Sequence, residues 1–175
     1  MIDYLVSVSI GVLSSFVASL IFLLFLTRVR PKIEISDKIA KSISSTGEPI
    51  YRIKIINKTR RSIINVKAEL QLVTPTVTPG GIIEKTKTIP LKRSEIMEIS
   101  KFDLKDKTAG YAFRFVIYEN LEELWKDETR SFLRFRVYAV DSLSGFGRVF
   151  VKEYHTKRNS IKEGDFEFGN SLEIK

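Results

Sequence analysis

Two arginines and a tyrosine alternate with apolar side chains along residues 132–140, and this pattern makes one face of the segment a candidate anion-binding surface. Successive side chains of a strand point to opposite faces of its sheet. Arg134, Arg136 and Tyr138 would therefore share one exposed face, with apolar residues between them facing a core. Cations beside exposed aromatic rings suit nucleotides, phosphates or an acidic partner.

The next segment, 148–154, extends this pattern if it pairs with the first. We expect Val149 and Val151 to point inward there, and a neighbouring strand to add Arg114. The pattern favours a simpler interpretation, a solvated strand face, because charge at every second position is what any half-exposed strand shows and long basic side chains also discourage pairing at a sheet edge. The candidate ligand-binding residues are Arg114, Arg134, Arg136, Tyr138, Arg148 and Lys152.

A second group of cations, Arg28, Arg30 and Lys32, directly follows an uncharged stretch from Tyr4 to Thr27. As a helix this stretch would be about 36 Å long, and about 20 apolar residues suffice to cross a bilayer. The residues before it carry no positive charge and no small-residue cleavage site follows, so we expect a retained anchor rather than a signal peptide.

The three cations predict both the orientation and a contact of this anchor. Positively charged flanks stay in the cytoplasm, so the N-terminus would face outward and the rest of the chain the cytoplasm. Each cation near an anionic membrane surface contributes about 1 kcal/mol. Arg28, Arg30 and Lys32 are therefore candidate ligands of lipid headgroups as well as a topology signal.

Small residues recur at every fourth position of the apolar stretch, at Ser7, Gly11, Ser15 and Ser19. Small residues with this spacing let two membrane helices approach closely. The stripe predicts self-association of the helix. Two alternatives are a lipid-facing helix that merely tolerates these residues, and the lining of a narrow oligomeric pore.

The composition argues against catalysis, a cofactor or a metal site. The chain has no Cys and one His, so thiol chemistry and His-rich metal sites are excluded. Asp141, Ser142, Ser144 and His155 supply the letters of a catalytic triad, but no spacing places them together. An acidic cluster is better explained as a salt-bridging patch; it comprises Glu119, Glu122, Glu123, Asp127 and Glu128.

The elements that must position these residues are mostly strands. The chain has 175 residues, of which 43% are hydrophobic, and a net charge of +8. Pro31 ends the helix, and about eight short segments with period-two alternation follow, separated by turns. The loops include a Pro/Gly-rich segment at 74–81. We expect an all-β chain with an immunoglobulin-like antiparallel sandwich; a small barrel is the alternative.

These elements divide the chain into three parts. Residues 1–31 form the membrane helix and its basic junction, residues 32–155 the sandwich, and residues 156–175 a tail that supplies one or two docking strands.

The order of segments resembles the cytoplasmic domain of inward-rectifier potassium channels. The likeness covers about residues 28–168. It rests on Arg30-Pro31-Lys32 before Ile35-Ser36, on Tyr51–Asn57 and Arg61–Leu72, on the hairpin 132–154 with Leu143-Ser-Gly145 in its loop, and on Ile161, Gly164 and Phe166. The resemblance implies an immunoglobulin-like fold, assembly around an axis and a lipid-binding junction. A second span and a selectivity filter are missing, so it does not imply potassium selectivity.

Together these patterns predict a non-enzymatic, single-pass membrane protein with a cytosolic module for binding or homo-oligomeric assembly. The alternative is an oligomeric, channel-like membrane effector gated by a nucleotide or lipid on the basic face. A third, weaker alternative is an accessory subunit of a channel or transporter. The expected partners are membrane lipids, further copies of the chain and an anionic small ligand; we do not expect double-stranded nucleic acid.

Overall fold

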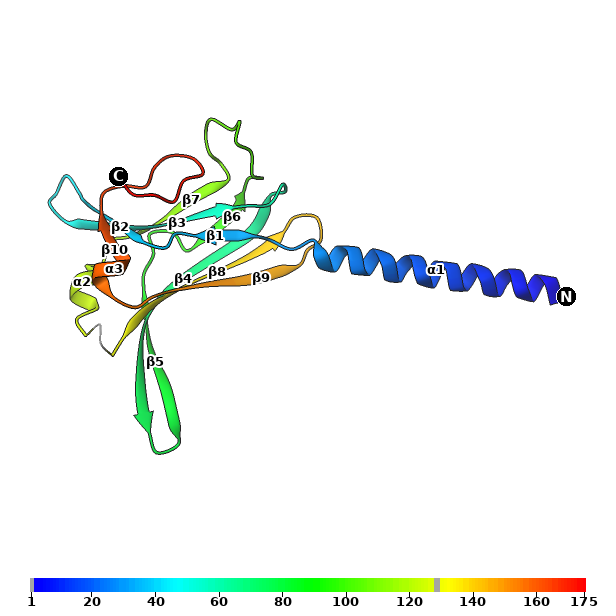
Figure 1. Cartoon of the computed structure of the whole chain (residues 1–175), viewed down its shortest axis with the longest axis horizontal. Coiled ribbons are helices and arrows are strands. Elements are labelled where there is room, and N and C mark those ends of the chain that lie inside the picture. Colours follow the sequence, from blue (N-terminus) through cyan, green and yellow to red (C-terminus); the bar gives the residue numbers. More distant parts are fainter. Residues whose placement is uncertain (1, 128–129) are drawn as a thin grey trace.

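The computed structural model describes residues 2–127 and 130–175, in which one long N-terminal helix precedes two β-sheets (Figure 1). Helix α1 spans Ile2–Arg28. Every side chain from Val6 to Phe25 is exposed, and none packs on the sheets. The helix is long and apolar enough to cross a membrane. This much fits either a membrane anchor or a signal sequence.

The first sheet is centred on β3, which pairs with three other strands. Its β7 covers one edge of β3, while β1 and β2 share the other edge, opposite residues 55–57 and 49–52. Residues 36–38 thus interrupt the strand between β1 and β2. The sheet contains β1 (Ile33–Ile35), β2 (Ile39–Ile43), β3 (Pro49–Asn57), β7 (Ala112–Ile117) and β10 (Ile161–Glu163).

The second sheet is centred on β4 and β8, with β9 at one edge and β5 and β6 along the other. All its pairings are antiparallel. Short helices α2 (Leu121–Leu124) and α3 (Lys157–Ser160) lie outside both sheets. The strands are β4 (Ile63–Thr78), β5 (Gly81–Ile89), β6 (Glu95–Ile99), β8 (Phe132–Asp141) and β9 (Gly147–Tyr154).

One hydrophobic core lies between the sheets. The rings of Phe115 on β7 and Phe135 on β8 meet edge to face across it, 5.4 Å apart. Trp125 is fully buried at the end of α2, and its indole N–H donates to the carbonyl of Ser131 at 2.8 Å. The expected β-rich class with one apolar helix is confirmed, and the two curled sheets fit a sandwich or a half-barrel.

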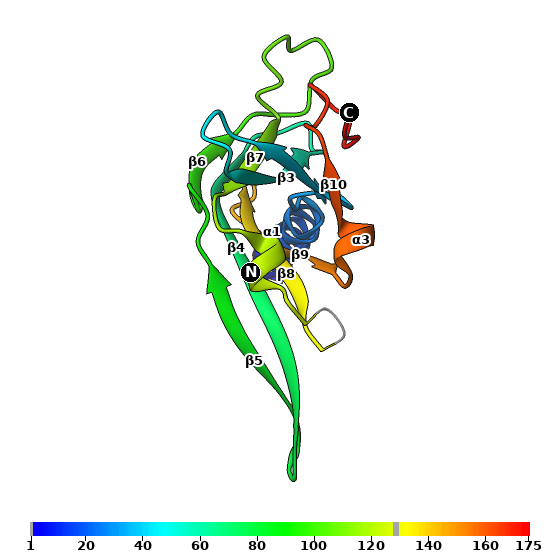
Figure 2. The same ribbon diagram turned by 90° about the vertical axis from the view of Figure 1, so that its left-hand side faces the viewer.

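The segment expected as a Pro/Gly loop at 74–81 is mostly strand. Strand β4 continues to Thr78, beyond Val73, its last residue paired with β8. Pro75 is tolerated because, among the residues that the structure describes, β4 pairs there with β5 alone, and proline is compatible with such an edge. We call residues 74–87 the arm. It projects sideways from the sheets, across the direction of α1, in both views (Figures 1 and 2).

The tail covers the outer face of the first sheet. Strand β10 joins this sheet by parallel pairing with β2. Further on, Phe166 and Ile174 form an isolated bridge and pack on Ala40. The tail therefore gives the sheet a second layer over part of its outer surface.

Candidate functional site

Four residues join α1 to the sheets, and their side chains alternate between core and solvent. Val29 and Pro31 are buried, whereas Arg28, Arg30 and Lys32 are exposed. Burial of Val29 and Pro31 holds the backbone of the junction in place, and the three predicted cations remain accessible to solvent. The structure thus brings the three predicted headgroup ligands together at the domain end of α1.

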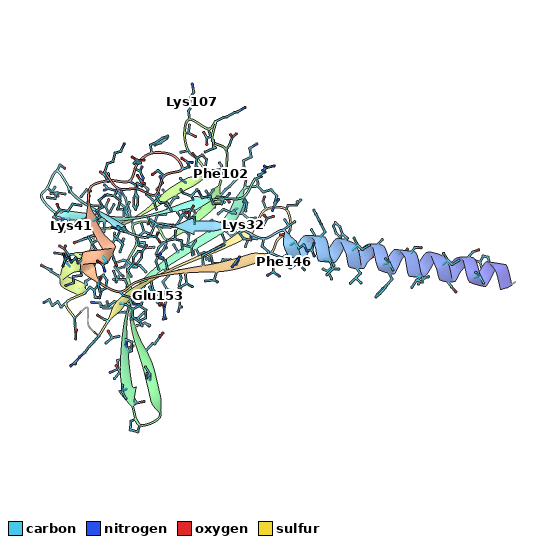
Figure 3. All side chains as sticks on the ribbon, viewed as in Figure 1. Lys32, Lys41, Phe102, Lys107, Phe146 and Glu153 are labelled. Carbon is cyan, nitrogen blue, oxygen red and sulfur yellow. The ribbon has the colours of Figure 1, made fainter. Side chains whose placement is uncertain are left out.

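Two loops of the domain hold this junction through its backbone. The hydroxyl of Ser144, in the β8–β9 loop, donates to the carbonyl of Val29. The amide of Lys58, in the β3–β4 turn, donates to the carbonyl of Lys32 at 2.8 Å. Lys32 and Phe146 lie near the end of the helix in Figure 3. The helix is therefore fastened to both sheets.

A buried carboxylate shapes the β8–β9 loop. Asp141 is completely buried and accepts hydrogen bonds from Arg61 Nε at 3.0 Å and from the amides of Leu143 and Ser144 at 3.0 and 3.1 Å. This fold of the loop leaves the side chain of Leu143 63% exposed. An apolar tip thus stands beside the basic junction.

The β3–β4 turn contains further cations, Lys58 and Arg60, that lie at the same end of the domain as the junction. The sequence alone could not place them there. Arg60 is exposed in the turn that Lys58 fastens to Lys32, while Lys58 itself pairs with Glu34 at 2.8 Å. Cations around an exposed apolar residue such as Leu143 form a surface suited to a membrane, whose anionic headgroups attract the cations. A basic turn is visible in the sequence, but its place beside the junction depends on contacts that local patterns do not encode.

The predicted basic face is divided between three surfaces. Arg134, Arg136 and Tyr138 share the outer face of β8, as expected from the buried residues that alternate with them. Arg148 and Lys152 point to the opposite face, because they pair with Ala139 and Phe135, which face the core. Arg114 lies on β7, in the other sheet.

The predicted orientation of β9 is wrong. Val149 and Val151 are 55% and 52% exposed, whereas Tyr154 is buried and its hydroxyl donates to the carbonyl of Ser36 at 2.8 Å. Both faces of the strand carry apolar as well as charged side chains, so its period did not identify the inner one. The larger rings of Phe150 and Tyr154 point toward the core side, and the valines face solvent beside Tyr138 and Arg136.

Arg134 is engaged within the chain. Its guanidinium forms a bidentate pair with Glu84 of the arm, at 2.6 and 2.9 Å, and its Nε donates to Glu153 at 2.8 Å. The hydrogen bond from Arg134 lowers the pKa of Glu84 below its usual value. Arg134, a predicted ligand-binding residue, thus fixes the arm to β8 in this structure.

Arg114 and the buried Lys54 together hold the tail. The Lys54 ammonium donates to the carbonyls of Glu167, Gly169 and Ser171 at 2.7–2.8 Å. Arg114 donates to the carbonyl of Phe166 at 2.9 Å. Burial, and then the nearby Arg114 charge, lower the pKa of Lys54 to about 8. A cavity of about 320 Å³ adjoins both cations and is also lined by aromatic rings, those of Phe113 and Phe168.

The small-residue stripe lies along the exposed surface of α1. The hydroxyls of Ser15 and Ser19 donate to the carbonyls four residues earlier, at 3.0 and 2.8 Å. These bonds satisfy the hydroxyls within the helix. A side chain built at Gly11 would meet nothing within 4 Å. Ser7, Gly11, Ser15 and Ser19 thus form a shallow, open surface.

The residues that suggested catalysis lie apart. Asp141 ends β8 beside the junction, whereas His155 follows the far end of β9 and stacks near Phe132, with 5.3 Å between ring centres. In the acidic cluster, Glu122 pairs with Lys41 at 2.7 Å. Glu128 lies outside the described residues.

No family model matches the sequence. No curated protein matches it either. Among solved structures, the sporulation control protein Spo0M of Bacillus subtilis aligns over 72% of this chain at 13% identity and a TM-score of 0.37. The chain spans about half, 49%, of that protein. A structural-genomics target named SoR45 aligns over 71% of this chain and 83% of its own length, at 14% identity and a TM-score of 0.34. A protein of Archaeoglobus fulgidus aligns over 72% of this chain and 96% of its own, at 13% identity and a TM-score of 0.26.

Proposed function

We propose that this chain is a non-enzymatic, single-pass membrane protein that presents an immunoglobulin-like β module at the cytoplasmic surface for homo-oligomeric assembly. One observation carries the proposal: the apolar window of α1 is 0% buried against the rest of the structure. Exposed apolar area is unfavourable in water by roughly 25 cal/mol per Å². Lipid removes this cost along the whole helix.

The junction supports the same arrangement. Arg28, Arg30 and Lys32 are exposed where the helix would leave the hydrocarbon, and Leu143 stands beside them. Cations that flank a span stay in the cytoplasm, which would place both sheets there. Tethering in one plane raises the effective concentration of the modules, so weak contacts suffice for assembly.

The chain offers a clean test of anchoring and topology because it has no Cys. Tyr4→Cys would mark the N-terminal side, and Thr46→Cys the exposed β2–β3 loop. In intact cells we expect a membrane-impermeant maleimide to label only the Tyr4→Cys chain. The Thr46→Cys chain should be labelled after permeabilisation. Labelling of Thr46→Cys in intact cells, or loss of the first 28 residues by mass, would refute the proposal.

A second candidate function is a membrane effector regulated by an anionic ligand. It is favoured by the cavity that adjoins Arg114, where a cation and the rings of Phe113 and Phe168 come together. Ligand binding to the folded state raises the melting temperature. We expect a nucleotide to raise the melting temperature of the full chain and Arg114→Gln to abolish that rise. A rise that survives Arg114→Gln would exclude this cavity.

A further inference from the structure

Two cations converge on one carbonyl oxygen beneath the tail. The ammonium of Lys54 on β3 and Nη2 of Arg114 on β7 both donate to the carbonyl of Glu167, at 2.8 and 3.3 Å. Lys54 and Arg114 are also direct partners where β3 pairs with β7. One neutral oxygen of the tail therefore lies between two positive charges on the outer face of the first sheet.

Neither cation has a carboxylate partner in the described chain, residues 2–127 and 130–175. None of the salt bridges there includes Lys54 or Arg114. The carboxylate of Glu167 pairs with Lys175 instead, at 2.8 Å. Lys54 is 1% exposed and Arg114 is half-buried. Two neighbouring cations with so little water around them favour a negatively charged ligand, because an opposite charge within a few ångströms stabilises their charged forms.

The cavity beside these two cations, of about 320 Å³, gives a ligand room to reach them. Binding sites for small molecules typically have volumes of about 300–1,000 Å³. Arg114 donates to the described chain only through Nη2, so its Nε and Nη1 have no hydrogen-bond partner there. Phe113 and Phe168 line the same cavity. The cavity therefore offers free donors for an anion and apolar surface for the organic part of a ligand.

We infer that Lys54 and Arg114 bind the phosphate group of a phosphate monoester, which replaces the carbonyl of Glu167 and releases the tail from the sheet. This inference rests on the second candidate function and adds the ligand class and the regulation of its site. An ammonium has three donors, and Lys54 already donates to three carbonyls of the tail. An anion can contact both cations only if it takes the place of one of these carbonyls. The Glu167 carbonyl is the one that Lys54 and Arg114 share.

Charge favours phosphate over the tail at this position. A phosphate monoester carries a charge of about −1.5 to −2 at pH 7, which balances two cations, whereas the carbonyl that it replaces is neutral. Hydrogen bonds between ionised groups are roughly twice as strong as neutral ones. The planar fork of a guanidinium also matches two phosphate oxygens. The tail has the advantage of belonging to the same chain, so the concentration of the ester decides which of the two occupies the position.

A glycine in the tail makes the competition testable. Gly164 has a φ of +120°, and a Cβ built there would lie 1.9 Å from the carbonyl oxygen of Lys175. Two backbone hydrogen bonds between Asp165 and Lys175, both 3.0 Å long, depend on this close approach. Gly164→Ala should therefore loosen the tail while leaving Lys54 and Arg114 in place. If tail and phosphate compete, this variant binds phosphate more tightly, because coupling between two binding events is reciprocal.

Calorimetric titration of the full chain in a phosphate-free maltoside detergent tests the site. The probes are AMP, phosphatidic acid in mixed micelles, and adenosine as the control without phosphate. We expect AMP or phosphatidic acid to bind, which distinguishes a soluble ester from a lipid headgroup, and adenosine not to bind. Arg114→Gln should weaken binding at least about ten-fold, whereas Arg136→Gln on the outer face of β8 should not. Binding of neither phosphate probe, or binding that Arg114→Gln leaves unchanged, would refute both the second candidate function and this inference.

Amide hydrogen exchange of the native chain tests displacement of the tail. The phosphate probe that binds should accelerate exchange several-fold in residues 165–175, whereas a ligand that merely filled the cavity would slow exchange there. Gly164→Ala should bind the same probe several-fold more tightly. If binding depends on Arg114 but exchange in the tail slows and Gly164→Ala binds no better, the second candidate function stands and displacement of the tail is refuted.

Discussion

The ammonium of Lys54 lies 2.7 Å from the carbonyl oxygen of Gly169, 115 residues further along the chain. Two more carbonyls of the tail complete its three donor bonds. A lysine of β3 thus helps to fix the position of residues 167–171. This one contact also explains why a position that alternates with apolar residues is charged and yet buried.

We expect Lys54→Met to release the tail and to lower the free energy of unfolding by about 1–3 kcal/mol. Loss of the ammonium leaves carbonyl groups without a donor, and each such group costs about that amount when it stays buried. Urea unfolding of the full chain in detergent measures the change, and limited proteolysis should cleave within residues 164–175. Lys38→Met is the exposed control. Equal protease resistance of the two variants would contradict this role of Lys54.

The lowered pKa of Lys54 makes stability depend on pH in a defined window. Its pKa is about 8 in the folded chain, against 10.5 for the ordinary side chain. Between these values the unfolded chain binds a proton that the folded chain does not, so stability increases with pH there. Below pH 8 the contribution is constant. Unfolding free energies of the native chain minus those of Lys54→Met should rise from pH 7.5 to pH 10; a flat difference would oppose the shift.

Removing Arg134 should loosen the arm without unfolding the sheets. Arg134→Gln deletes the bidentate contact to Glu84 and the bond to Glu153. We expect amide hydrogen exchange to accelerate several-fold in residues 82–87 and to stay constant in β8. Acid should have the same effect, because the contact is lost as the pH falls through the lowered pKa of Glu84. Unchanged exchange in the arm would show that the hairpin is rigid by itself.

Asp141→Asn should destabilise the junction. The carboxylate is completely buried and paired with Arg61, and removal of one partner of such a pair costs about 3–5 kcal/mol. Because Arg61 is 35% exposed, we expect the lower end of this range. Thermal unfolding of the full chain measures the loss, with Ser142→Ala as the neighbouring control. A melting temperature equal to that of the control would mean that the pair is not needed.

Gly11→Leu should reduce assembly through α1 while leaving the chain folded. The position is open within the chain, so the new side chain causes no internal clash, yet it would separate two helices packed on the stripe. We expect a several-fold weaker association in neutral nanodiscs, with Leu13→Ile as the control. If association is unaltered, the stripe faces lipid.

The helix and the inner face of β8 could be predicted because each is encoded by one local pattern. Twenty-four uncharged residues define the first, and alternation of Leu133, Phe135 and Val137 with cations defines the second. The predicted orientation of β9 was wrong because its valines and its aromatic residues both recur at every second position. The side chains on β9 that reach the first sheet, above all Tyr154, decide the outcome.

The candidate site depended on longer-range information. No local pattern states that β7 pairs with β3 rather than with β8, and this pairing removes Arg114 from the basic face. The partners of Arg134 also lie 50 and 19 residues away. By contrast, Arg28, Arg30 and Lys32 lie together at the end of α1 because chain connectivity alone keeps them close, and their role as headgroup ligands stays a prediction.

The hydrogen bonds that join Val29 and Lys32 to two separate loops oppose rotation of α1 relative to the two sheets. Rotation of α1 about its own axis must therefore turn the arm through the same angle. A contact that fixes the rotation of α1 in an assembly therefore also fixes the direction in which the arm points. Contacts through α1 and contacts through the arm then have to obey the same symmetry operator.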